Sequence, residues 1–586
     1  MEHRNYFCVD KSSRTFADNL VAFGFARLLR ELLAQQGDEP NDVVFQDCGA
    51  YFRLTTSHPV DSRFWGAAWT RICPARAVRT IKNAATLPAG IPYQDYEADK
   101  EQVSLHYAAR QSKIDRDDAP PLPPHWDVSR AINPAALPGY NNLVFDWWNL
   151  GEHQPLAIGL LLSLFSATPN ALADAVDTWK QLDGQYGWGI SAETTRLQLY
   201  NPDQGKGQNK VKSDGLSIGN VKGFWLIEWL KAVGFYEAAI TRQVRGTKDR
   251  KTFIVSPREL SHSVSQAVMA DFASTMSSET SIKFDVLAAI RYTDALLRHF
   301  QQDASHLARL LELRDVQKRV VAGFDTAFYK DLGNAVATLN ISFIALPRWV
   351  RIESRDDIAL YTDKTENRGL LRQLELLTRQ FDESHSDAFA LLHDLRDFVS
   401  GDDLAAFFRF STGFSGYYVS TRERGQYAYP MTTEFVERLI MGTNPSLTRI
   451  LKTEGFQNIA YAIRQSTVTA QFRKQQGDRR YDIRYGLGQE LARKAIYSDR
   501  FIAALSDFLH KYNAENAQVM ETRPGPYRRS VKTTDIEEIV QLIDEYGPET
   551  IANLLIAYGY ARVPRDDEEP GEEAPQEEIS DGTADL

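Results

Sequence analysis

Cysteine and long apolar segments are both scarce in this chain, and their scarcity excludes several classes of protein. Only three cysteines occur among 586 residues (Cys8, Cys48 and Cys73), and no two of them have the C-x-x-C spacing of a redox or zinc site. The most apolar run, Leu156–Phe165, is too short to span a bilayer and predicts a buried helix. Met1 to Arg14 is polar, so no signal peptide is expected. These features favour a reducing, cytoplasmic compartment and no membrane partner.

The sequence also lacks the short motifs that carry common enzyme chemistry. No G-x-x-x-x-G-K-[ST], G-x-S-x-G or H-E-x-x-H pattern occurs. The sequence therefore gives no motif for nucleotide hydrolysis, serine-hydrolase chemistry or zinc-protease chemistry. Gly401-Asp402-Asp403 precedes an apolar helical run, where an aspartate is expected to cap the helix rather than to hold a metal. We therefore predict no catalytic residue, no metal ligand and no cofactor.

One catalytic alternative stays open, a metal-dependent phosphohydrolase or nuclease of the HD type. His393 and Asp394 form the HD pair, and His385 lies upstream. Such enzymes need further ligands from other helices. The spacing of the possible additional ligands compels no such site; they are His299, Asp303, His306 and Asp387. Histidines without a metal role, near the surface, are the favoured interpretation.

The N-terminal part of the chain mixes helical and strand patterns. Apolar residues recur at helical spacing over 15–36, and strand-like runs follow in 41–55. Residues 115–138 are dense in proline and predict a linker or an extended arm. Further along we predict helices at 153–183, a strand at 194–200, a helix at 221–239, a hairpin at 240–255, helices at 257–276, 284–300 and 303–315, and a buried strand at 336–346.

From about residue 366 the pattern is almost wholly helical. Helices are predicted at 367–382, 386–399, 402–411, 432–441, 456–475, 486–513, 533–546 and 548–561. The fold class is therefore an α+β N-terminal body followed by an all-α C-terminal helical bundle. The predicted domains are the body at 1–365, the bundle at 366–565 and a disordered acidic tail at 566–586.

Charge is unevenly distributed along the chain. The formal net charge is −11, but residues 566–586 alone carry ten acids and no base. Residues 449–532 instead carry sixteen lysines and arginines against eight acids. The overall acidity therefore hides a basic region, which is the pattern of a protein that meets a polyanion with one part of its surface.

Three basic clusters are candidates for binding nucleic acid. The first is a polar, glycine-containing loop with Lys206, Asn209, Lys210 and Lys212. The second is the tip of the predicted hairpin with Arg245, Lys248, Arg250 and Lys251, and Arg242 close by. The third lies around a predicted interhelical loop, where Tyr481 and Tyr485 stand among five cations (Arg473, Lys474, Arg479, Arg480 and Arg484). Cations interleaved with aromatic rings are typical of surfaces that bind nucleic acid, because the cations contact phosphates and the rings stack on bases. Three unrelated solvated patches are the plain alternative.

The helix predicted at 486–513 continues the third cluster. On one continuous helix, Arg493, Arg500 and Lys511 nearly align and form a basic ridge beside an apolar face. Asp507 lies four residues before Lys511 and is expected to pair with it, which interrupts the ridge. The interhelical loop is therefore a stronger candidate than the helix behind it.

The α+β body with a lysine–glycine loop, followed by a helical bundle with a basic face, resembles the large subunit of CRISPR type I (Cascade) surveillance complexes. The most family-like segment is RRYDIRYGLGQELARKAIYSDRFIAALSDFLHKYNAEN, and the similarity is motif-like only over about 455–562. The region from 366 is similar to a fused small subunit. The resemblance implies a non-catalytic subunit in the cytoplasm of a prokaryote, active in antiviral defence.

The resemblance also implies partners and residue roles. The partners are a guide RNA, target DNA, the backbone and small subunits of the complex, and a helicase–nuclease recruited in trans. The protein would recognise a short duplex motif (the PAM) beside the target and stabilise the opened strand. Lys206, Asn209 and Lys210 would probe the motif. The displaced strand would be held by Arg473, Lys474, Arg479, Arg480, Arg484, Arg493, Lys494 and Arg500. A helical scaffold that binds only other proteins stays open as an alternative function.

Overall fold

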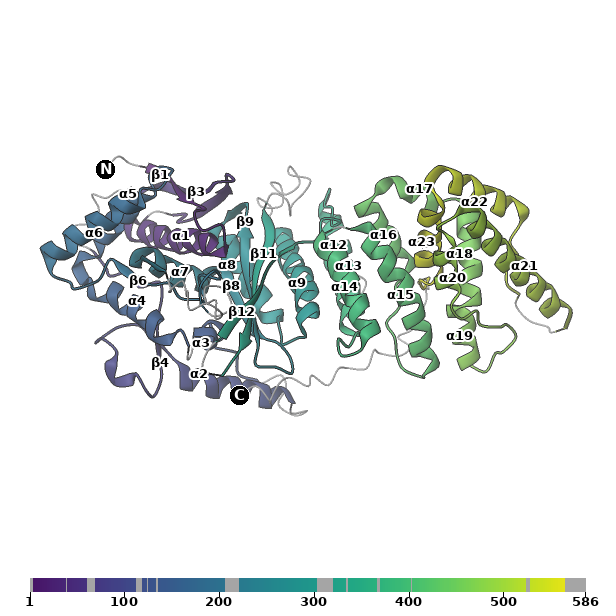
Figure 1. Cartoon of the computed structure of the whole chain (residues 1–586), viewed down its shortest axis with the longest axis horizontal. Helices are drawn as coiled ribbons and strands as arrows, with labels where there is room; N and C mark the ends of the chain where they lie inside the picture. Colours follow the sequence, from purple (N-terminus) through teal and green to yellow (C-terminus); the bar gives the residue numbers. More distant parts are fainter. Residues whose placement is uncertain are drawn as a thin grey trace, which may run out of the picture. The chain divides into compact units, whose positions relative to one another are not determined.

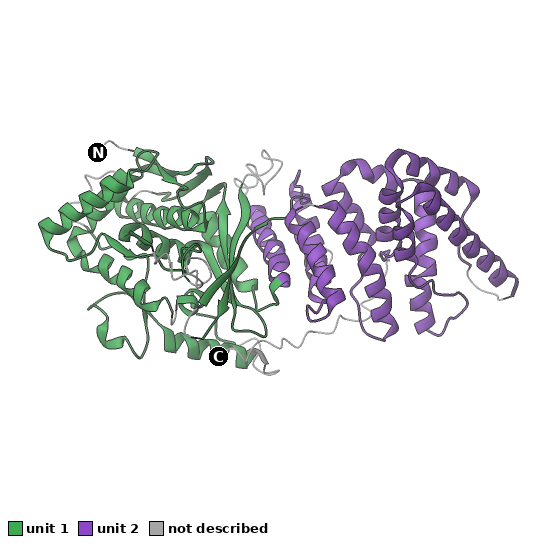
Figure 2. Ribbon diagram, in the orientation of Figure 1, with its two compact units in different colours: residues 1–281, 316–346, 578–586 green, residues 282–315, 347–577 purple. Residues whose placement is uncertain are grey.

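The computed structural model describes most of the chain (Figure 1). The described residues are 4–37, 39–60, 69–111, 119–123, 125–132, 135–205, 221–302, 320–333, 336–365, 369–401, 403–522 and 527–563. The chain divides into two compact units (Figure 2). Unit 1 comprises residues 1–281, 316–346 and 578–586, and unit 2 comprises residues 282–315 and 347–577. The predicted helix at 303–315, the lysine loop at 206–212 and the acidic tail lie outside the described residues.

Unit 1 contains two four-stranded sheets. The first has the order β1-β3-β2-β10, and its strands are β1 (Arg4–Asp10), β2 (Val43–Asp47), β3 (Tyr51–Val60) and β10 (Glu259–Ser261). The second has the order β12-β11-β9-β8, and its strands are β8 (Ala239–Gln243), β9 (Arg250–Pro257), β11 (Val321–Asp331) and β12 (Val336–Ala345). All their pairings are antiparallel. Two short pairs complete the strands: β4 (Ala77–Arg79) with β5 (Tyr93–Asp95), and β6 (Glu193–Thr195) with β7 (Lys222–Phe224).

Two buried helices, α1 (Phe16–Gln36) and α7 (Trp225–Ala238), form the centre of unit 1. They cross at Gly24 and Gly234, where an added Cβ would lie 2.0 Å from the Leu230 carbonyl oxygen and 1.9 Å from that of Leu20, respectively. Only glycine permits the two backbones to approach this closely. Helix α1 also contacts β3 and β9, so it connects the two sheets.

The other helices of unit 1 surround this centre. They are α2 (Tyr96–Gln111), α3 (Trp126–Ile132), α4 (Leu137–Asn149), α5 (Gln154–Leu164), α6 (Leu172–Tyr186) and α8 (His262–Thr275), with short 3₁₀ turns at Ala84–Thr86 and Gly151–His153. Helix α3 and the start of α4 lie inside 115–138, so the prediction of an extended arm there is wrong over this stretch. Trp126 is buried, and packing of this kind overrides the proline signal.

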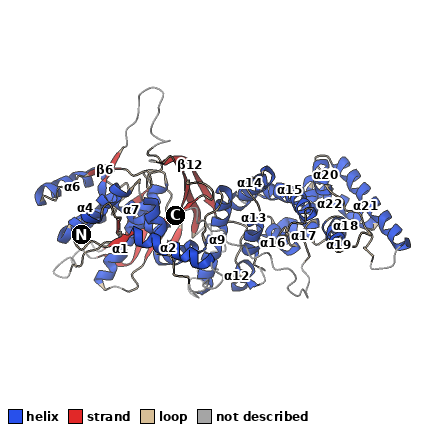
Figure 3. Cartoon of the chain, turned by 90° about the horizontal axis from the view of Figure 1, so that it is seen from below, coloured by secondary structure: helices blue, strands red, loops and turns tan. Residues whose placement is uncertain are grey.

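Unit 2 is helical, and all twelve strands of the described residues belong to unit 1 (Figure 3). Its helices are α9 (Ser281–Gln302), α12 (Arg355–Thr362), α13 (Leu370–Arg379), α14 (Ser386–Gly401), α15 (Leu404–Glu423), α16 (Thr433–Thr443), α17 (Thr448–Leu451), α18 (Glu454–Ser466), α19 (Val468–Gln475), α20 (Leu487–Lys494), α21 (Ser498–Thr522), α22 (Thr533–Tyr546) and α23 (Pro548–Gly559), with a 3₁₀ turn at Pro445–Leu447. An α+β N-terminal part followed by a helical C-terminal part confirms the predicted fold class.

Several element predictions need correction. The helix predicted at 456–475 is interrupted at Thr467, whose backbone departs from helical geometry, and the helix predicted at 486–513 is interrupted at 495–497. The strand predicted at 194–200 ends at Thr195. The division between the units also differs from the predicted boundary at 365, because α9 and residues 347–365 belong to the helical unit. Arg291 on α9 pairs with Glu375 on α13 at 2.7 Å, which ties this helix to its unit.

The strand predicted at 336–346 exists as β12, but it is not a buried strand. Leu339, Ile341 and Phe343 are about half exposed. Strand β12 ends its sheet, so one edge and part of one face lack a cover among the described residues.

Candidate nucleic-acid interface

The third basic cluster is brought together with two arginines from another helix. Helix α19 ends beside the end of α15, where the Gln475 side-chain amide donates to the Arg422 carbonyl oxygen at 2.9 Å. Lys474 pairs with Glu423 at 2.7 Å. We call this surface the basic end of unit 2; it comprises Arg422, Arg424, Arg473, Lys474, Arg479, Arg480 and Arg484. Arg422 and Arg424 were missed from the sequence because they lie fifty residues upstream in a helix predicted to end at 411.

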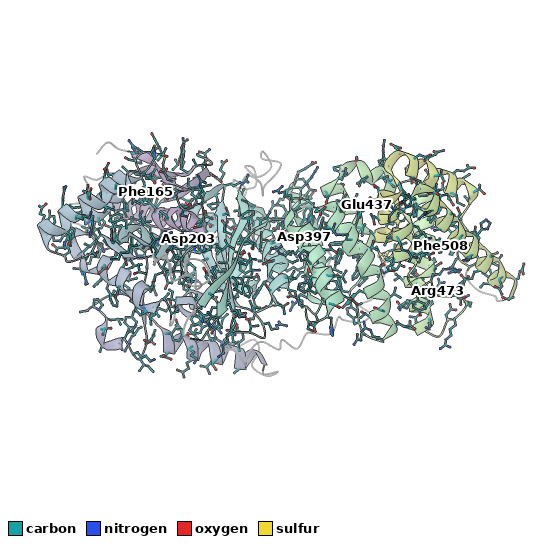
Figure 4. The ribbon with its side chains drawn as sticks, in the orientation of Figure 1. Phe165, Asp203, Asp397, Glu437, Arg473 and Phe508 are labelled. Carbon is teal, nitrogen blue, oxygen red and sulfur yellow. The ribbon has the colours of Figure 1, made fainter. Side chains whose placement is uncertain are left out.

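Intramolecular ion pairs neutralise part of the positive charge of the basic end. Both carboxylate oxygens of Asp478 accept from Arg480, and these bonds lower the pKa of Asp478 to about 2. Hydrogen bonds from Lys474 and Tyr485 lower the pKa of Glu423. Two other cations, Arg473 and Arg479, make no side-chain hydrogen bond or ion pair within the described chain. Arg473 is labelled in Figure 4, and Arg479 is exposed. These two are the cations most available to an external phosphate.

Aromatic side chains stand among the cations. Tyr485 is 54% exposed and its hydroxyl lies 3.4 Å from the Lys474 ammonium nitrogen, while Phe472 on α19 is 42% exposed. Exposed rings next to uncommitted cations provide stacking surfaces for bases beside charges for phosphates. Of the two tyrosines predicted to offer stacking surfaces in the loop between α19 and α20, Tyr485 is exposed, whereas Tyr481 is buried and is corrected as a candidate.

A buried arginine fixes this loop in place. The Arg528 guanidinium lies 3.5 Å from the ring centroid of Tyr481 and donates to Glu515 at 2.6 Å. Glu515 in turn accepts from the backbone N–H of Asp482 at 2.6 Å. Arg528 is 3% exposed, so it serves the fold and not the surface. No sequence signal distinguished it from the other cations of 449–532.

The ridge predicted on one long helix does not form as expected. Arg493 and Lys494 end α20, whereas Arg500 belongs to α21, and the turn at 495–497 breaks the helical phase between them. Arg500 instead lies 4.6 Å from the ring centroid of Tyr497. The predicted pair of Lys511 with Asp507 is present at 2.6 Å. Arg493, Arg500 and Lys511 are exposed, and Lys494 is half-buried.

The hairpin cluster is mostly engaged within unit 1. Arg250 donates to the carbonyl oxygens of Arg130 and Ala131, and burial lowers its pKa. Lys251 is 5% exposed and lies over the Phe253 ring. Both predictions of direct nucleic-acid contact are therefore corrected, because these side chains face the protein.

The remaining hairpin cations differ in their availability. Arg245 pairs with Glu279 at 3.5 Å and donates to the Ser278 carbonyl oxygen. Lys248 is exposed at the turn between β8 and β9 and stays a candidate. The first cluster, with Lys206, Asn209, Lys210 and Lys212, lies outside the described residues and stays a prediction.

The residues of the catalytic alternative have ordinary surface partners. His393 faces Asp397 at 3.4 Å, and Asp394 pairs with Arg409 at 2.9 Å. Asp403 accepts from the backbone N–H of Ala405 and caps α15, as predicted. Within the described ranges, no three His, Cys, Asp or Glu side chains come together as a metal site requires.

Comparisons with other proteins give no family. The sequence matches no protein-family profile, and a search of curated proteins finds no relative of this chain. A separate finding concerns membranes: among the described helices, none combines the length and apolar character needed to cross a bilayer.

Proposed function

We propose that this protein is the non-catalytic, nucleic-acid-binding large subunit of an RNA-guided CRISPR surveillance complex of type I. The basic end of unit 2 would hold a single nucleic-acid strand, in the manner of a small subunit fused to the large one. The observation that carries the proposal is the contact between the ends of α15 and α19, which brings Arg422 next to Gln475 and Glu423 next to Lys474 and so joins cations from two helices.

The chemistry of that surface favours a single strand over a duplex. Arg473 and Arg479 have no partner of opposite charge within the described residues, so their full charge is available to phosphates. Phe472 and Tyr485 offer ring faces, which stack on unpaired bases and not on bases inside a duplex. A displaced DNA strand presents both groups at once.

The other assigned roles belong to the same proposal. The partners are a guide RNA, target DNA, backbone and small subunits, and a helicase–nuclease recruited in trans. The loop with Lys206, Asn209 and Lys210 would probe a duplex motif beside the target. Arg493, Lys494 and Arg500 would extend the path of the strand; Arg493 and Arg500 are exposed, and Lys494 is half-buried. The place of action is the cytoplasm of a prokaryote.

The direct test is binding of a fluorescent single-stranded oligonucleotide to the full chain. The double variant Arg473→Glu, Arg479→Glu should weaken binding by at least about tenfold near 0.1 M salt. The control is Lys452→Glu. Lys452 is an exposed cation just before the beginning of α18, whereas α19 and the basic end follow the end of α18. Helix α18 has thirteen residues, which separates the two sites by about 20 Å.

Two outcomes would reject the proposal. Equal affinity of the double variant and wild type would remove the basic end as the binding surface. Absence of any affinity for DNA or RNA at low salt would favour a protein scaffold instead. Purification from the native host adds an independent check, because the proposed complex should carry a short RNA of uniform length.

A further inference from the structure

Strand β12 exposes an apolar strip where its sheet ends. Leu339, Ile341 and Phe343 alternate along the strand, and they are 57%, 43% and 46% exposed. Ile341 and Phe343 pair with Ala327 and Asp325 and share one face of the strand, and the exposed Leu339 lies next to them at a register shift of the pairing. We call Leu339, Ile341 and Phe343 the apolar strip. Proteins normally prevent such strand edges from pairing with other chains, either with charged side chains or with a helix or loop that covers the edge.

The free edge is closed at one end only. The side chain of Gln198 hydrogen-bonds to the hydroxyl of Thr338 at 2.7 Å, which occupies the beginning of β12. From 339 to 345, no other strand of the described residues pairs with the outer edge. An extended peptide could therefore add to the sheet along the same residues that carry the apolar strip.

A cavity with two carboxylates in its lining adjoins the strip on the same face. Phe343 is paired directly with Asp325 on β11, so their side chains are cross-strand neighbours. Asp325 lines a cavity of about 460 Å³ together with Asp18, Asn19 and Arg14. Asn19 donates to Asp325 at 2.8 Å, which fixes the Asp325 carboxylate at the floor.

The cavity is lined by two carboxylates, Asp18 and Asp325, and by two cations, Lys11 and Arg14. One oxygen of Asp18 accepts from the backbone N–H of Ser13, and the other is buried without a hydrogen-bond partner. Burial raises the pKa of Asp325 to about 6 and also raises the pKa of Asp18. Lys11 is already paired with Asp47 at 2.6 Å. Arg14 is exposed at the rim, so a cation that binds must reach past it to the floor.

We propose that β12 is a docking strand for an extended segment of another protein. The segment carries apolar side chains at alternate positions, which pack on the apolar strip, and one lysine or arginine, which enters the cavity beside Asp325 and Asp18. Backbone hydrogen bonds to the open edge provide affinity, and the apolar and cationic side chains provide specificity. This interaction is independent of the nucleic-acid surface on unit 2.

Two short peptides provide the test with the full chain. Both have valine at alternate positions; one ends in lysine, and the other ends in glutamate. Fluorescence anisotropy should show the lysine peptide binding about tenfold more tightly than the glutamate peptide. Phe343→Thr should weaken the lysine peptide about tenfold, and Asp325→Asn should make the two peptides bind equally. Ile81→Thr is the matched control, because Ile81 is 80% exposed elsewhere in unit 1 and its change should leave affinity unaltered.

Several results would overturn the proposal. These are no binding of either peptide at about 1 mM, equal binding of both peptides by the wild type, or equal effects of Phe343→Thr and Ile81→Thr. Sedimentation identifies the competing occupant. If Phe343→Thr converts a dimer to a monomer and leaves peptide binding unchanged, a second copy of this chain covers the strip and the proposal is wrong. Unchanged melting temperatures of the variants confirm that any loss of binding is local.

Discussion

The β8–β9 hairpin and the basic end of unit 2 look alike in sequence and differ in structure. Each has five cations in one short segment, residues 242–251 in the hairpin and residues 473–484 in the basic end, but the hairpin directs most of its cations at carbonyl oxygens and carboxylates of unit 1. The basic end keeps Arg473 and Arg479 without an ion pair among the described residues. The difference teaches that equal local charge can serve the fold in one segment and leave individual cations, here Arg473 and Arg479, available to a ligand in another.

The largest effect on stability is expected for Arg528. It is a buried cation that contacts the loop of the basic end and serves the fold. Arg528→Met should lower the free energy of unfolding by about 3–5 kcal/mol, because it leaves Glu515 partly buried and without its cation. Urea unfolding followed by circular dichroism measures the loss. Arg529→Met is the control: Arg529 is exposed, lies over the Tyr461 ring, and should change stability by less than about 1 kcal/mol.

A smaller loss is expected within the hairpin. Arg242 pairs with Asp127 and donates to the carbonyl oxygens of Ala273 and Met276, which end α8. Arg242→Met should cost about 2 kcal/mol of stability and leave oligonucleotide affinity unchanged. The neighbouring Lys248→Met should leave stability unchanged within about 0.5 kcal/mol, because Lys248 is exposed. If Arg242→Met is fully folded and still binds the oligonucleotide more weakly, the hairpin also contributes to binding, and the proposed difference between the two regions is wrong.

Removal of an aromatic ring sharpens the comparison without altering charge. Tyr485→Ala should weaken single-strand binding about tenfold and leave duplex binding nearly unchanged, because the ring stacks only on unpaired bases. Tyr485→Phe keeps the ring and loses only the hydroxyl near Lys474, so its affinity should stay close to wild type. Equal losses for single strand and duplex would exclude stacking as the source of affinity.

The smallest effect expected is a gain. Asp478→Asn releases Arg480 from its ion pair and should increase oligonucleotide affinity about two- to threefold. Asp507→Asn makes the same charge change beside Lys511 on α21, away from the basic end, and serves as the control. A similar gain in both variants would indicate an effect of net charge alone.

Much of the fold was predictable, because local signals and packing agree there. Helix α1 begins after Thr15, whose hydroxyl accepts from the backbone N–H of Ala17, and the apolar residues at helical spacing that predicted it are buried. The interruption at 495–497 was not predictable, since the helical pattern continues through it. The Gly488 N–H at the start of α20 donates to the hydroxyl of the distant Tyr560, which is a contact that no local pattern encodes.

The sequence predicted the composition of the candidate site, but it did not predict which residues belong to the site. The sequence places Arg473 and Arg250 in equally basic segments, yet only Arg473 is available, because exposure depends on the tertiary neighbours. Arg422 and Arg424 join the site through contacts between α15 and α19 that no local pattern encodes. The exposed face of β12 was hidden for the same reason, since an apolar alternation does not reveal whether another element covers it.

The salt dependence of single-strand binding tests the central claim most directly. Two neutral double variants are compared with the wild type: Arg473→Gln, Arg479→Gln in the basic end and Arg245→Gln, Lys248→Gln in the hairpin. Each phosphate contact contributes about 0.7 to the slope of log K against log salt for a single strand. We predict that the slope decreases by about 1.4 for the basic-end variant and stays at the wild-type value for the hairpin variant. Equal slopes for wild type and the basic-end variant, or a decrease confined to the hairpin variant, would contradict the assignment.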